Sequence, residues 1–365
     1  MILNLNIVVL NVGLNTMINP HAWFLTDLKS VPSNGIKVFS TFACGGGSTM
    51  GYKLAGCQVI GANDIDPEMA YHYKLNHNPR HYFLCPIKDL LKKDLPQELY
   101  ELDILDGSPP CSAFSMAGNR EKDWGKKKKF REGQSVQVLD DLFFDYLDLV
   151  DRLKPKVSIA ENVKGMIQGN AKGYVKMVFD RYKEIGYRPQ LFLVNAVDCG
   201  VPQKRERVFF IAIRNDIDVD KLVLNPKHKW ISAGEATSDL QVLTEDEIKD
   251  TFPAKTALRF WQKTKPGDSF SGECNNQTGK SSFFNWIKLD PFLPSGTLQA
   301  EHAKTYHWKE CRQLTYREWK RLGSFPDDYQ ARNDKIGKYI IGMSVPPKMM
   351  YEVAKAVIKQ WLKPD

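Results

Sequence analysis

Two hydrophobic patterns alternate along residues 36–214, and this alternation constrains the fold more than any other feature of the sequence. Short apolar runs typical of buried strands occupy residues 36–43, 58–66, 102–107, 156–162, 190–197 and 207–214. Segments with helical periodicity lie between them, at residues 48–57, 67–77, 138–154 and 173–186. This order predicts an α/β fold with a mostly parallel, Rossmann-like sheet, helices on both faces, and ligands at the carboxyl ends of the strands.

The sequence outside this alternation divides into three further parts. Residues 1–34 begin with an apolar run at 1–10 that lacks a basic start and is broken by asparagines, so we expect neither a signal peptide nor a membrane span there. We interpret them as an N-terminal extension outside the main fold, either an extra strand or a tail. Residues 215–295 show no sustained period, which predicts a small irregular domain after a main domain at 35–214. Residues 296–365 return to helical patterns and are expected to rejoin the main domain.

The charge and the cysteines narrow the class of protein. The chain has 51 Lys and Arg residues against 43 Asp and Glu, a formal net charge of +8, which suits a polyanionic partner without requiring one. The seven cysteines form no Cys-x-x-Cys pair, so we expect no disulfide framework and no metal site. We also expect no association with a membrane. A protein of the reducing cytoplasm fits these features.

A glycine-rich turn, Gly45–Gly47, follows the first predicted strand. The turn does not match the phosphate-binding P-loop motif. It does not match the dinucleotide-binding motif GxGxxG either, because the sixth position counted from Gly45 is Met50, where a glycine is needed. Asp64 and Asp66 close the second predicted strand, and Asp64 comes nineteen residues after Gly45, close to the spacing at which an acid binds ribose hydroxyls. This favours a nucleoside cofactor without a phosphate, such as S-adenosylmethionine. A tight turn whose acids cap the next helix is the alternative.

A cysteine follows two prolines at the end of the third predicted strand, in the sequence Pro109-Pro110-Cys111. Consecutive prolines restrict the backbone, so the thiol of Cys111 is held in a defined direction at the edge of the sheet. It is a candidate nucleophile. The alternative is a buried cysteine in a rigid loop.

Two more polar groups occur where predicted strands meet this edge. Glu161 and Asn162 end the strand at 156–162, fifty residues after Cys111. Gln203, Arg205 and Arg207 precede or begin the strand at 207–214, and alternate strand residues share one face of a sheet. Taken alone, the arginines are more typical of a solvated strand edge.

These motifs, in this order, resemble those of the cytosine-C5 DNA methyltransferases. The resemblance continues in residues 312–329, RQLTYREWKRLGSFPDDY, which are similar to the family's ninth conserved block, and in residues 341–349, IGMSVPPKM, which are similar to its tenth. It covers roughly residues 36–360. The family's target recognition domain falls at 215–295. The resemblance implies the sheet of S-adenosylmethionine-dependent methyltransferases.

Three positions depart from the family pattern. Cys44 replaces the first glycine of Phe-x-Gly-x-Gly-Gly, Met343 replaces the asparagine of Gly-Asn-Ser-Val-Pro, and Asp64 stands where a glutamate is commoner. We expect these changes to adjust the affinity for the cofactor without abolishing it, because Gly46, Gly47 and Ser344 are retained.

The resemblance implies a covalent mechanism. Cys111 adds to C6 of cytosine, Glu161 donates a proton to N3, and Arg205 holds O2 with Arg207 in support, while S-adenosylmethionine provides the methyl group for C5. The base is flipped out of the duplex. Residues 112–135 correspond to the family's mobile loop, which closes on DNA.

The resemblance also implies the cofactor contacts and the partners. The implied cofactor-binding residues are Phe42, Gly46, Gly47, Asp64, Ile65 and Asp89, with Pro109 and Ser344 as additional walls. The partner is double-stranded DNA, bound by a monomer in the cytoplasm near the nucleoid, and a separate restriction endonuclease is a candidate companion. Candidate readers of the DNA sequence are Arg259, Gln262, Asn275 and Gln277.

Three alternatives remain open at this point. A methyltransferase acting on an exocyclic amine carries a similar Pro-Pro motif but does not require the cysteine after Pro110. The tRNA-methylating branch of the family is associated with a Cys-Phe-Thr tripeptide, which this chain lacks. A catalytically silent DNA-binding homologue is disfavoured because Cys111, Glu161, Arg205 and Arg207 are all present.

Overall fold

A computed structural model of the chain describes residues 19–110, 127–128, 137–138, 142–168, 172–280, 282–300 and 304–363. Cys111 lies outside the described residues. So does the predicted mobile loop at 112–135, apart from the short strand β5 (Lys127–Lys128), which pairs with β6 (Gln137–Val138).

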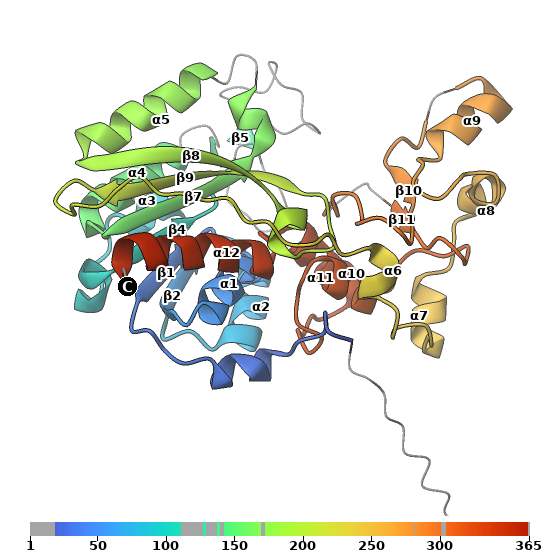
Figure 1. Ribbon diagram of the computed structural model, residues 1–365, viewed down its shortest axis with the longest axis horizontal. Coiled ribbons are helices and arrows are strands. Elements are labelled where there is room, and N and C mark those ends of the chain that lie inside the picture. Colours follow the sequence, from blue (N-terminus) through green and yellow to red (C-terminus); the bar gives the residue numbers. More distant parts are fainter. Residues whose placement is uncertain are drawn as a thin grey trace, which may run out of the picture.

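A seven-stranded sheet forms the centre of the molecule, in the order β3-β2-β1-β4-β7-β9-β8 (Figure 1). Its strands are β1 (Lys37–Thr41), β2 (Gln58–Asp64), β3 (His81–Leu84), β4 (Ile104–Gly107), β7 (Val157–Val163), β8 (Tyr187–Asn195) and β9 (Glu206–Arg214). The first five strands in this order are parallel, which confirms the predicted α/β class. The edge strand β3 was not predicted, because its four residues are at most half-buried and carry no strong apolar pattern.

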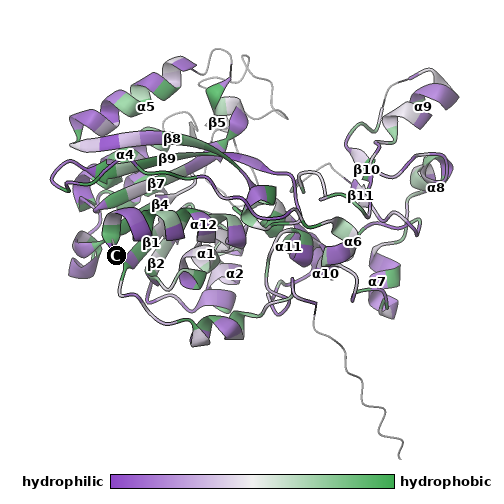
Figure 2. Ribbon diagram, in the orientation of Figure 1, coloured by the Kyte–Doolittle hydropathy of each residue, from purple (hydrophilic) through white to green (hydrophobic). Residues whose placement is uncertain are grey.

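Helices cover both faces of the sheet (Figure 1). One face carries α1 (Gly47–Leu54), α2 (Pro67–His77) and α12 (Pro347–Val357), and the other carries α3 (Ile87–Leu90), α4 (Leu142–Leu153) and α5 (Lys172–Glu184). Val38 of β1 packs into the apolar cluster under α1 and α12, whereas its neighbour Phe39 packs into the cluster under α4 and α5. Ile104 and Leu105 of β4 divide in the same way. Figure 2 shows the resulting pattern of apolar inner strands and polar outer helix faces.

The strand β9 runs antiparallel to β7, with Val157 opposite Ile213 and Val163 opposite Arg207. Its first residues therefore lie at the sheet edge where β1, β4 and β7 end. Periodicity in the sequence predicts which face a strand residue occupies but not the direction of the strand, so this proximity was not predictable from the alternation.

A smaller lobe lies to one side of the sheet (Figure 1). It contains α7 (Glu245–Asp250), α8 (Lys255–Trp261), α9 (Ser271–Thr278), β10 (Trp286–Lys288) and β11 (Lys304–Tyr306). Phe260, Phe270 and Tyr306 form the centre of its own apolar cluster. Because β11 pairs with β10, this lobe includes residues beyond the expected limit at 295.

The C-terminal part joins the lobe to the sheet. It comprises α10 (Tyr316–Leu322), α11 (Asp334–Met343) and α12, followed by a π-helical turn (Ile358–Leu362). A short helix, α6 (Ala233–Ala236), packs with α10 and α11 into one apolar cluster. Among all the helices that the structure describes, none has the length and apolar character of a membrane span.

Residues 19–34 pack on the protein, although we expected the N-terminal extension to lie outside the main fold. Trp23 Nε1 donates to the carbonyl of Ser324 at 3.0 Å, and Asn34 Nδ2 donates to the carbonyl of Ala55 at 2.8 Å. A 3-10 helix, η1 (Leu25–Ser30), lies between these two contacts. Apolar and polar residues do not alternate regularly in this stretch, so its position was not predictable from the sequence and depends on these tertiary contacts.

Candidate active site

Three strands bring polar groups together at the carboxyl edge of the sheet. The chain leaves β4 through Pro109 and Pro110. Glu161 and Asn162 stand near the end of β7, and β9 begins beside them. Asn162 Nδ2 donates to the carbonyl oxygen of Pro109 at 3.0 Å, which ties the proline turn to the end of β7. The proline turn that precedes Cys111 is therefore fixed to the end of β7 that carries Glu161.

Glu161 and Arg207 form a largely buried ion pair, with 2.9 Å between Arg207 Nε and Glu161 Oε1. Arg207 lies opposite Val163, so it is the diagonal neighbour of Glu161 on the same face of the sheet, within reach of a long side chain. Glu161 is 8% exposed. A carboxyl and a guanidinium side by side at an edge offer a donor and an acceptor to a planar, polar ligand.

Arg205 immediately precedes β9 and occupies a different environment from Arg207. Its Nη1 donates to the carbonyl of Leu298 at 3.1 Å and its Nη2 donates to the carbonyl of Gly342 at 2.8 Å. Gln203 accepts from the amide of Leu298 at 3.1 Å. Burial, together with the nearby charge of Arg207, lowers the pKa of Arg205 below its usual range. Arg205 and Gln203 thus fasten two remote segments to the start of β9.

A cavity opens at the same edge, beside the ends of β1, β2 and β4. The residues that line it are Phe42, Cys44, Asn63, Asp64, Ile65, Asp66, Met69, Cys85, Pro86, Ile87, Ser108, Pro110, Leu142, Tyr339 and Met343. Most are apolar, and none of these described residues is basic. The cavity therefore suits a ligand with an apolar, planar part and hydroxyl groups, and it offers no charge partner for a phosphate.

Asp64 connects this cavity to the glycine turn. Its Oδ2 accepts from the amide of Cys44 at 2.7 Å and its Oδ1 accepts from the amide of Asp66 at 2.9 Å. Burial raises the pKa of Asp64, and these backbone donors oppose the rise. Each carboxylate oxygen retains a lone pair that can accept a hydrogen bond from a ligand hydroxyl.

Residues 36–359 match the family of C-5 cytosine-specific DNA methylases. The chain belongs to this family. It is a DNA cytosine-C5 methyltransferase, which confirms the resemblance seen in the motifs.

Individual relatives extend over nearly the same length. The type II methyltransferase M.NgoPII of Neisseria gonorrhoeae is 28% identical over 356 residues, which cover 89% of this chain and 96% of the relative. The type II methyltransferase M.DdeI of Desulfomicrobium norvegicum is 27% identical and covers 88% of each chain. A DNA modification methyltransferase of an E. coli prophage shares the fold, with a TM-score of 0.67, 20% identity, and coverage of 89% of this chain and 99% of that one.

Of the eight predicted cofactor-binding residues, three line the cavity of this methyltransferase and five do not. Phe42, Asp64 and Ile65 line the cavity. Asp89 is exposed on α3, and the neighbouring Ile87 lines the cavity. The remaining predicted residues, which lie outside the lining, are Gly46, Gly47, Pro109 and Ser344.

The glycines of the turn are required by close packing. Gly46 has a φ of +88°, and a Cβ there would lie 2.1 Å from Nε2 of His77. A Cβ on Gly47 would lie 2.3 Å from the carbonyl oxygen of Val345. The turn can therefore approach α2 and the residues after α11 only with glycine at both positions. This packing brings Met343, the last residue of α11, to the cavity.

Several lining residues were missed by the reading of the sequence. Met69, Leu142 and Tyr339 come from three different helices, and their position at the cavity depends on how each helix packs against the sheet. Only Met69 carried a signal, since it stands in the first turn of a helix that follows Asp64.

Two departures from the family pattern, Cys44 and Met343, both line the cavity. Cys44 Sγ lies 3.5 Å from Met69 Sδ, and Cys44 adopts a φ of +48°, a region that favours the glycine it replaces. Burial raises the pKa of the Cys44 thiol to about 12, so it is a neutral thiol at physiological pH. The altered residues thus change the wall of the cavity directly.

Asp106 is a buried carboxyl beneath the site. Ser40 Oγ donates to its Oδ2 at 2.6 Å and the Tyr52 hydroxyl donates to its Oδ1 at 3.1 Å. Burial, partly offset by these two donors, raises the pKa of Asp106 to about 7. In an unfolded chain an aspartate has a pKa of about 3.9.

We expect Asp106→Asn to change the pH dependence of stability. Between these two pKa values the folded protein binds the proton and the unfolded chain does not, so the wild type loses stability as the pH rises toward 7. From pH 5 to pH 8 this loss amounts to about 2.5 kcal/mol and is absent from the variant. Urea unfolding of both proteins at the two pH values measures it. Identical changes in the two proteins would contradict the assignment, since all other titrating groups cancel in the comparison.

Proposed function

We propose that this methyltransferase uses S-adenosylmethionine to methylate C5 of a cytosine flipped out of double-stranded DNA. The proposal rests on one observation: the cavity and the Glu161–Arg207 pair lie at the same edge of the sheet. Pro110, the residue before Cys111, lines the cavity, and the carbonyl of Pro109 is bonded to Asn162, the neighbour of Glu161 in β7. When bound, S-adenosylmethionine supplies an electrophilic methyl group. The other requirements of the reaction fall to side chains of this chain.

Cys111 is proposed as the nucleophile. C5 of cytosine is too electron-poor to be alkylated, and addition of a thiolate to C6 forms an S–C6 bond and makes C5 enamine-like. After alkylation, a base removes the proton at C5 and the S–C6 bond breaks, which frees the thiolate. The two prolines limit the directions open to Cys111, and the bond from Asn162 to Pro109 holds their turn at the end of β7.

We propose that Glu161, in its protonated form, donates a proton to N3 and accepts it back when the S–C6 bond breaks, and that Arg207 holds O2 as electron density builds up on the ring. This assigns to Arg207 the contact that the family resemblance had suggested for Arg205. The reason is geometric. Arg207 Nε lies 2.9 Å from Glu161, and Nη1 of Arg207 donates to the carbonyl of Glu206. In Arg205, both Nη1 and Nη2 donate to backbone carbonyls. Arg205 remains in the proposal as a positioning residue.

The cofactor is proposed to bind with its ribose hydroxyls at Asp64 and its adenine between Phe42, Ile65 and Ile87. This fits a cavity that is mostly apolar, contains carboxylates, and has no basic residue among the described ones that line it. Gly46, Gly47 and Ser344 support the turn from behind, and Pro109 supports the wall at Pro110. The exposed Asp89 has no contact with the cavity that would favour a role in binding.

The small lobe is proposed to read the DNA sequence. Arg259 and Gln262 are exposed on and just after α8, Asn275 is exposed on α9, and Arg259 Nε donates to Gln277 Oε1 at 2.9 Å between the two helices. Amide and guanidinium groups of this kind recognise base edges in the major groove. We further propose that the protein acts as a monomer in the cytoplasm near the nucleoid, and that a restriction endonuclease acts separately beside it.

Nucleoside analysis and bisulfite sequencing of DNA from cells expressing the protein test this function together. We expect 5-methylcytosine above the level of an empty-vector control, confined to one short DNA sequence. Mass spectrometry of the nucleosides separates the C5 product from N4-methylcytosine, and the same analysis of tRNA tests the RNA branch. An N4 product, a tRNA product alone, or unmodified DNA would contradict the proposal.

A further inference from the structure

Residues 19–25 precede the family match, which begins at residue 36, and they join two separate parts of the protein. The first contact is with the end of α6. Asn19 is 5% exposed, and its Nδ2 lies 2.8 Å from Asp239 Oδ1 and 3.1 Å from the carbonyl of Glu235. Its Oδ1 accepts from the amide of His21 at 2.9 Å. The amide group of Asn19 is thus committed to this position.

The second contact is with the loop that follows α10. Trp23 Nε1 donates to the carbonyl of Ser324, and the Trp23 carbonyl accepts from the amide of Asp327 at 2.8 Å. The amide of Leu25 donates to Asp328 Oδ1 at 2.7 Å. Trp23 and Leu25 also pack against the apolar cluster shared by α6, α10 and α11. Figure 1 shows this blue segment running from η1 toward α10 and α11.

A buried arginine connects the two contacts. Arg321 of α10 is 3% exposed and donates to both oxygens of Asp239, at 2.9 and 2.8 Å, and to both oxygens of Asp327, at 2.6 Å each. Asn19 contacts Asp239 at one end of this chain of ion pairs, and Trp23 contacts Asp327 at the other. The N-terminal segment therefore closes over a buried, charged junction.

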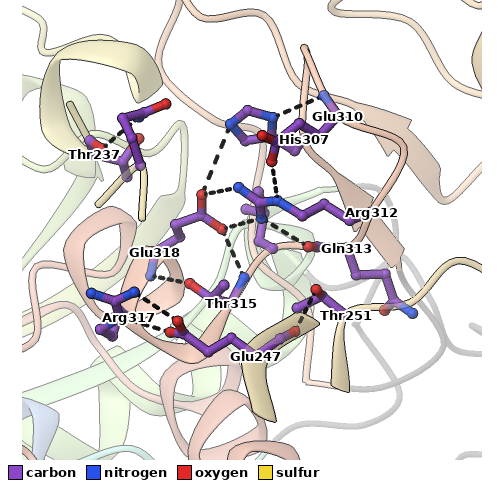
Figure 3. A network of polar contacts seen from close by, with 12 residues as sticks. Thr237, Glu247, Thr251, His307, Glu310, Arg312, Gln313, Thr315, Arg317 and Glu318 are labelled. Carbon is purple, nitrogen blue, oxygen red and sulfur yellow. Dashed lines mark hydrogen bonds and ion pairs between the residues drawn. The ribbon is translucent and has the colours of Figure 1, made fainter. Parts of the chain in front are cut away.

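A second junction joins the small lobe to α10 from another side (Figure 3). Arg317 of α10 donates to both oxygens of Glu247 in α7, and the amide of Gln313 donates to the carbonyl of Thr251. Arg312 donates to both oxygens of Glu318, at 2.8 and 2.9 Å. Helix α10 is thus attached at two points, through Arg321 to Asp239 and through Arg317 to Glu247. Two attachments restrain the lobe against rotation, which a single attachment would allow.

We propose that residues 19–25 form a clamp that fixes residues 233–239, and the DNA-reading lobe beyond them, against α10. The clamp holds α8 and α9 in one orientation relative to Glu161 and Arg207. This inference rests on the proposed function of the small lobe in reading DNA. Loosening the clamp weakens DNA binding and discrimination between DNA sequences, and leaves cofactor binding and the chemical step unchanged.

The test compares full-length Asn19→Ala and Asn19→Asp with a matched control, Ser30→Ala, which loses only a bond to Asp27 within η1. Asn19→Asp places a carboxylate against that of Asp239, so it is expected to be the more severe variant. We expect it to raise KM for DNA roughly 10-fold, the effect of one unpaired buried polar contact, with kcat and cofactor Kd within about 2-fold of wild type. Ser30→Ala should match the wild type.

Hydrogen exchange separates loosening of the clamp from general unfolding. In the Asn19 variants, amides of residues 233–250 should exchange faster while those of β4 and β7 keep the wild-type rate. Trp23→Phe removes the bond to Ser324 and part of the ring that packs on the apolar cluster, but it keeps the backbone bond to Asp327, so it should show the same pattern more weakly. Unchanged KM and exchange, or equal losses of cofactor binding and DNA binding, would overturn the clamp. An inactive wild type would instead refute the proposed function.

Discussion

Replacing Cys111 by alanine is expected to abolish methyl transfer while DNA binding survives. Without the thiolate, C5 never becomes enamine-like, so we expect kcat to fall by at least about 10⁴-fold. The backbone and recognition contacts with DNA do not involve the sulfur, so a gel-shift titration should give the wild-type Kd. The measurement is transfer of a radiolabelled methyl group from S-adenosylmethionine to DNA. An equal yield of 5-methylcytosine from the variant would refute the mechanism.

A covalent complex should identify the reacting sulfur directly. With DNA that carries 5-fluorocytosine at the target, no proton is available for removal from C5, so the S–C6 bond cannot break and the adduct accumulates. We expect mass spectrometry to find the DNA on the peptide that contains Cys111.

Cys44 is the informative control for this experiment. It lines the cofactor cavity, but burial raises the pKa of its thiol to about 12, which leaves almost no thiolate at neutral pH. Cys44→Ala should therefore form the adduct, and Cys111→Ala should not. An adduct on Cys44, or none in the wild type, is incompatible with the assignment.

Arg207→Ala is expected to reduce kcat by about 10²–10³-fold, the usual effect of removing one group that stabilises developing charge. It also leaves the carboxyl of Glu161 without its 2.9 Å partner in a buried place, which lowers the free energy of unfolding. Arg207→Lys should recover only part of kcat, because lysine keeps the charge but not the geometry of the guanidinium. Single-turnover kinetics and urea unfolding measure the two effects separately.

Arg205→Ala should behave differently. It removes the donors to Leu298 and Gly342, and Gly342 precedes Met343 in the cavity wall. We expect a loss of stability of about 3 kcal/mol and a higher KM for the cofactor, with a much smaller change in kcat than in Arg207→Ala. A selective loss of kcat in Arg205→Ala, with stability unchanged, would return the O2 contact to Arg205.

Much of the fold followed from local patterns. The helices at 47–54 and 67–77 and the strands at 37–41 and 157–163 lie where periodicity predicted them, because their apolar residues must face a core on one or both sides. The strand β3 and the elements of the small lobe were not predicted. They are short, and a short element with one half-buried face leaves little periodic signal.

The candidate site was predictable where a residue stands at the end of a strand. Phe42, Asp64, Ile65 and Glu161 follow or end strands, and the carboxyl ends of parallel strands meet at one edge. Tyr339 and Leu142 could not be predicted in this way. They lie on helices, and only the packing of each helix against the sheet brings its side chain to the cavity. The proposed cofactor role of Asp89 rested on a family motif without a strand end nearby, and the structure leaves that side chain exposed.

Local sequence was sufficient for the class of fold, the edge at which chemistry occurs, and the residue types present there, since each of these depends on short-range periodicity and on side-chain chemistry. Three features depended on contacts between residues far apart in the chain. The antiparallel direction of β9 sets Arg207 beside Glu161, the remote carbonyls of Leu298 and Gly342 occupy Arg205, and the partners of Asn19 lie more than two hundred residues away. Alternation along a strand predicts which face of the sheet a side chain occupies. Its contacts on that face depend on strand register and long-range packing, which no local pattern encodes.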